Sequence, residues 1–122
     1  MAAAGLKVID PAALPPARPV RLAELLDYAP GAVVSRALAK ASGGSVTLFA
    51  FELGQELSEH TAPFDAIVEV LDGEVDLTIG GEPVAARAGE TVLMPAGVPH
   101  ALRARTRFKM VLTMVRAQKV AA

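Results

Sequence analysis

The sequence predicts a single all-β domain, built as an antiparallel sandwich or barrel. About eight short stretches rich in apolar and β-branched residues follow one another between residues 32 and 115, as expected for strands. Turn-forming dipeptides such as Asp72-Gly73 and Gly80-Gly81 separate these stretches at close spacing. No amphipathic helix lies between them, although a fold of alternating strands and helices would need one. With 122 residues, the chain is long enough for one domain and too short for two.

The N-terminal 30 residues predict an extended arm followed by a short helix. Residues 1–20 are rich in Ala and Pro, and Pro has no N–H to donate, which favours an arm over a strand in a sheet. Leu22, Leu25 and Leu26 recur with helical spacing and predict about two helical turns over residues 21–28. We therefore divide the chain into an arm and short helix (1–30), a barrel (31–116) and a tail (117–122).

The strands expected in the barrel follow the turn signals along the chain. The stretch 45–53 is the strongest, and it is apolar on both faces, so we expect both faces to be covered. Val46, Leu48 and Ala50 share one face of it, and Phe49 and Phe51 share the other. The expected strands are 32–38, 45–53, 65–71, 74–79, 83–86, 91–94, 100–104 and 108–115.

Composition excludes several classes of function. Hydrophobic residues make up 52% of the chain, which excludes wholesale disorder. The net charge of −1 argues against a nucleic-acid-binding surface, and no apolar run is long enough to span a membrane. The absence of cysteine excludes disulfides, thiolate metal sites and a cysteine nucleophile. The first ten residues have no apolar core of a secretory signal, so we expect a cytoplasmic protein.

The two histidines, His60 and His100, lie in segments with distinctive spacing. The first segment places glycines before and after His60, and the second places His100 three residues after Gly97. Both segments resemble the two motifs of the cupin family, which are small β-barrels of the jelly-roll type. The first family motif has Gly, His, His, Glu and Gly where this chain has Gly54, His60, Ala62, Ala66 and Gly73. The second has Gly, Pro, Gly, His and Asn where this chain has Gly89, Pro95, Gly97, His100 and Ala104.

The resemblance covers roughly residues 32–115 and implies a small single-domain cupin with a degenerate metal-binding motif. In the family, two His and a Glu of the first motif and the His of the second bind a divalent metal. Here His60 and His100 remain, while Ala62 and Ala66 replace the other two ligands. Fe, Mn, Zn or Ni held weakly by the two histidines is one expectation. A hydrogen-bonded pair without metal is the other.

Three nearby carboxylates are candidates for a substitute ligand: Glu56, Glu59 and Asp65. If His60 faces inward, strand alternation turns Glu59 and Asp65 outward. Glu56 has the inward parity but lies four residues upstream, near the mouth of the barrel. A β-bulge would change these directions.

Alternation also predicts what surrounds the histidines. It places Val68 and Val70 beside Ala66 on the inner face, and Leu102 beside His100. We expect Phe49 and Phe51 on the opposite wall. Such a mostly apolar cavity suits a small apolar or aromatic molecule with one polar handle. The alternative is that these side chains simply fill the barrel.

A row of alternating cations has the opposite parity, so we expect it on the solvated outside of the barrel. The row consists of Arg103, Arg105, Arg107 and Lys109.

Strands that are apolar on both faces also predict a homodimer, because a second copy would cover the outer faces. The resemblance implies the same assembly, with the N-terminal arm reaching the neighbour. The leading functional hypothesis is therefore a dimeric cupin that binds a small molecule near His60 and His100. The alternatives are a metal-dependent oxygenase or isomerase, a metal-free enzyme using the histidines as an acid–base pair, and a regulatory or structural module with a filled barrel. Whether the protein is an enzyme stays open.

Overall fold

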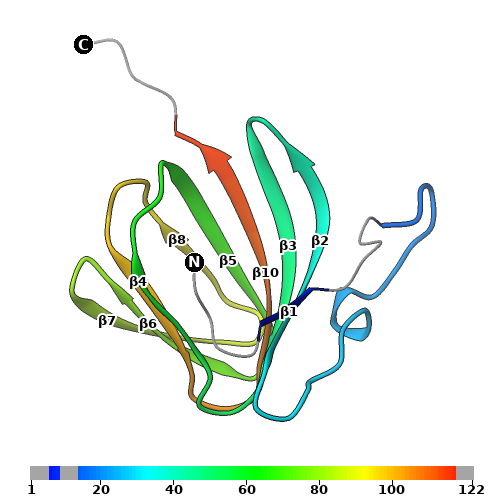
Figure 1. Cartoon of the computed structure of the whole chain (residues 1–122), viewed down its shortest axis with the longest axis horizontal. Coiled ribbons are helices and arrows are strands. Elements are labelled where there is room, and N and C mark those ends of the chain that lie inside the picture. The colour runs from blue at the N-terminus through cyan, green and yellow to red at the C-terminus, as the bar shows by residue number, and fades with distance from the viewer. Residues whose placement is uncertain (1–5, 9–13, 118–122) are drawn as a thin grey trace.

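The described residues form two facing β-sheets (Figure 1). The structure, a computed structural model, describes residues 6–8 and 14–117. One sheet has the strand order β1-β2-β3-β10-β5-β8, and the other has the order β4-β9-β6-β7. The elements are β1 (Leu6–Val8), the 3-10 helix η1 (Leu22–Glu24), β2 (Val33–Ala41), β3 (Gly44–Phe51), β4 (Glu56–His60), β5 (Phe64–Asp72), β6 (Glu74–Ile79), β7 (Glu82–Arg87), β8 (Thr91–Met94), β9 (His100–Ala104) and β10 (Phe108–Arg116).

The strand predictions are confirmed, and β6, β8 and β9 have the predicted bounds. β4 was not among the expected strands, because its residues ELSEH contain one apolar side chain and no alternation. These residues form a strand because they pair with β9, a contact that the sequence of β4 does not predict. Between the described strands, no ladder closes the two sheets into a continuous barrel.

Two N-terminal predictions are wrong in detail. Leu6–Val8 is not a free arm but a short strand, which pairs in parallel with Val33–Ser35 at the edge of β2. This tripeptide precedes the prolines, so its N–H groups are available to the exposed edge of β2. The predicted two-turn helix is a single 3-10 turn, Leu22–Glu24. Its N-cap, Arg21, provides no side-chain hydrogen bond, and its leucines are stabilised by packing on a sheet rather than by helix continuation. The predicted tail lies outside the described residues from position 118 onward.

The main core lies between the two sheets. Phe51 stacks on Phe108 with 4.5 Å between ring centroids, and both side chains are fully buried. Val68 and Val70 of β5 and Leu102 of β9 join the same cluster, so the inward parity predicted for these strands is confirmed. Removing this apolar area from water is the main driving force for bringing the sheets together.

A second apolar cluster lies on the outer face of the six-stranded sheet. Leu48 and Ala50 of β3 and Val111 of β10 are covered there by the chain's own segment 22–29, with Leu26 buried in the contact. We call this segment the strap. Both faces of β3 are therefore covered, as predicted, but the cover on this part of the outer face comes from the same chain. This portion of the sheet does not require a second copy.

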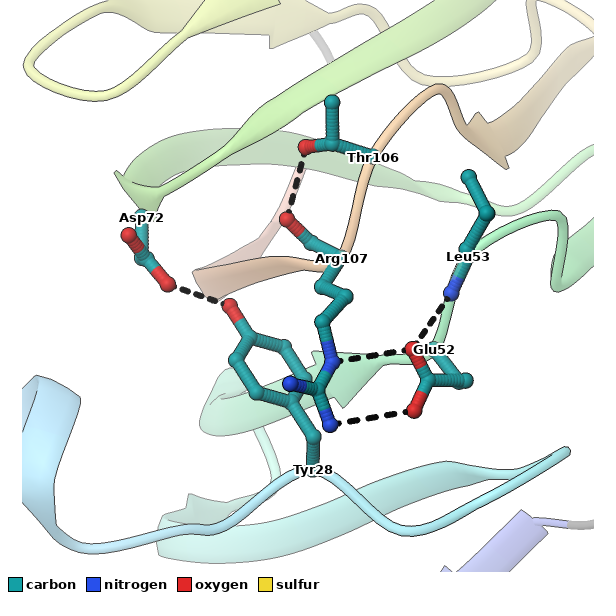
Figure 2. Close-up of polar contacts among 6 residues, drawn as sticks. All are labelled: Tyr28, Glu52, Leu53, Asp72, Thr106 and Arg107. Atoms are coloured by element: carbon teal, nitrogen blue, oxygen red, sulfur yellow. Dashed lines mark hydrogen bonds and ion pairs between the residues drawn. The ribbon is translucent and has the colours of Figure 1, made fainter.

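A polar cluster anchors the strap to the sheet (Figure 2). The Tyr28 hydroxyl donates a hydrogen bond to Asp72 Oδ2, and the Arg107 guanidinium carbon lies 4.5 Å from the centre of the Tyr28 ring. Arg107 in turn forms an ion pair with Glu52 at 2.9 Å. The Lys109 ammonium lies 4.9 Å from the same ring and donates to the carbonyl of Ala23. Arg107 and Lys109 are thus engaged with the strap, rather than forming a purely solvated edge as predicted.

In the part of the chain that the structure describes, no helix is long and apolar enough to cross a membrane.

Candidate ligand site at the paired histidines

The two histidines lie side by side on neighbouring strands. His60, the last residue of β4, is the register partner of His100, the first residue of β9. Their ring centroids are 4.4 Å apart, and the rings meet edge to face at 68°. His100 is 4% exposed and shares the inner face of β9 with Leu102, whereas His60 is half-buried. The pair therefore lies at one end of the space between the sheets.

A β-bulge in β4 sets the direction of His60. Leu57 pairs with Leu102 and His60 with His100, so three steps along β4 correspond to two along β9. The extra residue brings Leu57 and His60 to the same side although their positions differ by an odd number. Leu57 is accordingly 1% exposed and belongs to the core.

Each ring is held by a backbone carbonyl two residues before it. His60 Nδ1 lies 2.8 Å from the Ser58 carbonyl oxygen, and His100 Nδ1 lies 3.2 Å from that of Val98. A carbonyl only accepts hydrogen bonds, so both Nδ1 atoms carry the proton. In the neutral ring, the lone pair is then on Nε2.

No described residue bonds to the Nε2 atom of either histidine. Within residues 6–8 and 14–117, each ring has one hydrogen-bond partner, the backbone carbonyl named above, and no fully enclosed side-chain nitrogen or oxygen is left unpartnered. The Nε2 of His100 must therefore reach accessible space although the residue as a whole is buried. Two acceptor nitrogens are thus available to a bound molecule.

Burial lowers the pKa of His100, because the charged imidazolium is poorly solvated there. The hydrogen bond to the Val98 carbonyl opposes this shift, and the adjacent charge of a protonated His60 adds to it. The neutral form of His100 is therefore favoured near neutral pH. It can accept a hydrogen bond through Nε2 but carries no charge with which to hold an anion.

The residues predicted to line a pocket with the histidines lie on the inner faces of both sheets. They all belong to the main core cluster: Phe49, Phe51, Ala66, Val68, Val70 and Leu102. The register row next to the histidines is Leu57, Leu102 and Leu77, so the imidazoles border a purely apolar interior. A molecule at the two Nε2 atoms would meet aliphatic side chains on that side.

The nearby carboxylates do not complete a metal site. Glu56, assigned the inward parity by simple alternation, is exposed and pairs in register with Arg103, because the bulge reverses the parity upstream of His60. Glu59 is exposed, and Asp65 Oδ1 accepts a hydrogen bond from the Ala96 N–H at 2.9 Å. Among the described residues, no group of three or more His, Cys, Asp or Glu is placed to hold a metal ion. The two imidazoles alone do not fit the three-ligand sites of catalytic zinc or non-haem iron.

Comparison with known protein families identifies this fold. A family model described as the cupin domain matches residues 47–116, which include β4, β9 and both histidines. This chain belongs to the cupin family. No curated protein matches its sequence.

Several solved structures share the fold of this cupin at appreciable sequence identity. A conserved protein of unknown function from Streptococcus pyogenes is 33% identical with a TM-score of 0.83, and the match covers 87% of this chain and 93% of that one. A cupin superfamily protein from Desulfitobacterium hafniense is 30% identical with a TM-score of 0.80, covering 85% and 95%. A cupin 2 conserved barrel domain protein from Leptotrichia buccalis is 40% identical with a TM-score of 0.74, covering 76% of this chain and 45% of that one. Two of these descriptions name the cupin family and none names an activity, so the function has to be argued from the site.

Proposed function

We propose that this cupin binds a small, mostly apolar or aromatic molecule that donates a hydrogen bond to the paired histidines. The observation that carries the proposal is the pair of unused Nε2 acceptors on rings 4.4 Å apart. The carbonyls of Ser58 and Val98 fix both rings in one tautomer, so the acceptors are oriented before a ligand arrives. Such orientation reduces the entropy lost on binding.

The chemistry of the site selects the class of ligand. A neutral imidazole accepts from hydroxyl and N–H groups, and the lowered pKa of His100 disfavours the charged form that an anion would need. The adjoining row of leucines favours an apolar or aromatic body. A phenol or an aromatic amine combines both features. An ether of the same shape lacks the donor.

Matched probes test this proposal on the full chain. Phenol and aniline carry a donor, whereas anisole has a similar ring without one. We expect phenol and aniline to shift the backbone amide resonances of β4 and β9 in NMR titrations at lower concentrations than anisole. His100→Phe or His60→Phe should weaken phenol binding by about tenfold, the value of one lost hydrogen bond. His60 is half-buried and offers a second variant if His100→Phe does not fold.

Glu56→Gln is the control variant, because this exposed carboxylate lies on the same strand but points away from the pair. It should leave phenol binding unchanged. The proposal is wrong if none of the probes shifts resonances of β4 and β9, if anisole binds as well as phenol, or if the histidine variants bind phenol as tightly as the parent protein.

A further inference from the structure

The histidine pair belongs to a row of four side chains across the four-stranded sheet. His60 pairs in register with His100, and His100 pairs with Ile79 of β6. Ile79 pairs in turn with Glu82, the first residue of β7. Register partners on antiparallel strands point to the same side of a sheet, and Ile79 packs against the main core. Glu82 therefore lies on the same face as the two imidazoles, at the far end of their row.

The β6–β7 hairpin supports this direction for Glu82. A two-residue turn, Gly80-Gly81, joins the strands, and both glycines have positive φ, at 58° and 82°, as a tight hairpin requires. Val84 and Ala86 alternate with Glu82 along β7, and both belong to the main core or pack against it. Glu82 thus has the inward parity, yet it is exposed. Its carboxylate lies at the rim of the space between the sheets.

The Glu82 carboxylate has no counter-charge of its own. Within residues 6–8 and 14–117, it forms no ion pair and accepts no hydrogen bond. Asp76, on the opposite face of the same hairpin, is by contrast held by Arg105 at 2.8 Å. The negative charge of Glu82 is therefore available to a bound molecule.

We propose that Glu82 selects the charge of the ligand at the paired histidines, favouring an aromatic molecule with a hydrogen-bond donor at one end and a cationic amine at the other. This assignment rests on the proposed function, because it adds a second contact to the same bound molecule. Neighbouring strands lie about 4.8 Å apart, so the backbone of Glu82 is about 10 Å from that of His100. An aromatic ring with a short side chain bridges such a span. Ile79 lies between the two and offers an apolar surface to the ring.

Three para-substituted phenols of similar length test this assignment on the full chain at pH 7. 4-Propylphenol has a neutral side chain, tyramine carries an ammonium group, and 4-hydroxyphenylacetate carries a carboxylate. In NMR titrations, we expect tyramine to bind about two- to fivefold more tightly than 4-propylphenol, the range of an exposed ion pair. We expect 4-hydroxyphenylacetate to bind more weakly than 4-propylphenol.

Two variants with the same change in net charge locate the source of this preference. Glu82→Gln should bring tyramine and 4-propylphenol to equal affinity. Glu56→Gln is the matched control, because Glu56 is exposed on the outer face of the same sheet, and it should keep the preference of the parent protein. Glu82→Lys should reverse the order, so that 4-hydroxyphenylacetate binds most tightly. A purely structural role of Glu82 would weaken all three ligands together without changing their order.

The neutral 4-propylphenol separates this assignment from the proposed function. If 4-propylphenol binds but tyramine binds no more tightly, or if Glu82→Gln keeps the preference, the assignment of Glu82 is wrong and the histidine site stands. The assignment is also wrong if Glu56→Gln removes the preference as strongly as Glu82→Gln, because the preference would then come from the net charge of the protein. If none of the three compounds binds, the proposed function fails together with this assignment.

Discussion

At the scale of single residues, hydrogen bonds to the backbone decide what the two histidines can do. The Ser58 and Val98 carbonyls take the Nδ1 protons, and burial keeps His100 neutral near pH 7. The sequence predicted that both imidazoles face one interior space, because motif spacing and alternation are local properties. It could not predict the tautomer, which depends on carbonyls positioned by the fold.

Acidification should destabilise the protein through His100. Its pKa is lowered on folding, so between that value and the usual imidazole pKa of ~6.5 the unfolded chain binds more protons than the folded one. The free energy of unfolding therefore falls as the pH decreases through that window. Chemical denaturation across this pH range should show a smaller fall in the free energy of unfolding for His100→Gln than for the parent protein. An equal fall in both proteins would contradict the account.

The Tyr28 hydroxyl should contribute measurably to stability. Its pKa is raised by burial and by its hydrogen bond to Asp72, so it stays protonated and keeps donating. Tyr28→Phe should lower the free energy of unfolding by about 1 kcal/mol. In an Asp72→Ala background, Tyr28→Phe should leave the free energy of unfolding almost unchanged. A decrease that persists in that background would mean that the hydrogen bond to Asp72 is not what stabilises the protein.

At the scale of elements, the strands were more predictable than their connections. Alternation in β5 and β9 identified the inward residues because each strand follows a simple two-residue period. β4 departs from that period, since its bulge arises from pairing with β9, and the direction of Glu56 could not be predicted from parity. The strap and β1 form through contacts between residues distant in sequence, which local patterns do not encode.

Leu26 should act as the apolar anchor of the strap. It is 3% exposed and packs in the outer cluster. Leu26→Ala should lower the free energy of unfolding by roughly 2–4 kcal/mol, through lost burial and the cavity left behind. The exposed Leu53 is the matched control, and Leu53→Ala should change stability by less than about 0.5 kcal/mol. Similar costs in the two variants would argue against the strap as a stabilising cover.

The β2–β3 hairpin requires glycine at position 44. A Cβ built there would lie 2.0 Å from the carbonyl oxygen of Met114 on β10, whereas one on Gly43 would meet nothing within 4 Å. Gly44→Ala should therefore lower the free energy of unfolding by about 1–3 kcal/mol, and Gly43→Ala should leave it almost unchanged. Thermal unfolding of both variants checks this, and a neutral Gly44→Ala would mean that β3 and β10 are not as close as described.

At the scale of the whole molecule, the chain has the cupin architecture, and its described residues form no group of three or more potential metal ligands. Alanines stand at two positions where the family motif has metal ligands, and the described residues offer two imidazoles and no adjoining carboxylate. The fold was predictable from motif spacing, because glycines and prolines mark the turns between the strands. The ligand was not, because one architecture serves many functions.

Divalent metal should therefore contribute little to this protein. Dialysis against EDTA should leave the melting temperature and the histidine NMR signals unchanged, because two imidazoles are fewer than the three protein ligands of catalytic zinc sites. Calorimetric titration with Zn²⁺ should show no stoichiometric binding after chelation. Tight binding of one equivalent, lost in His60→Ala, would instead favour the metal-dependent enzyme hypothesis.

Histidine ring NMR tests the central claim most directly, because the chain has only two histidines and hence four ring nitrogens. In mildly alkaline solution, long-range nitrogen–proton correlations should show the proton on Nδ1 and the lone pair on Nε2 in both rings. Cross-relaxation between the two rings should report their close contact. Protons on Nε2, or rings without mutual cross-relaxation, would contradict the account, because the two acceptors would then not be presented together.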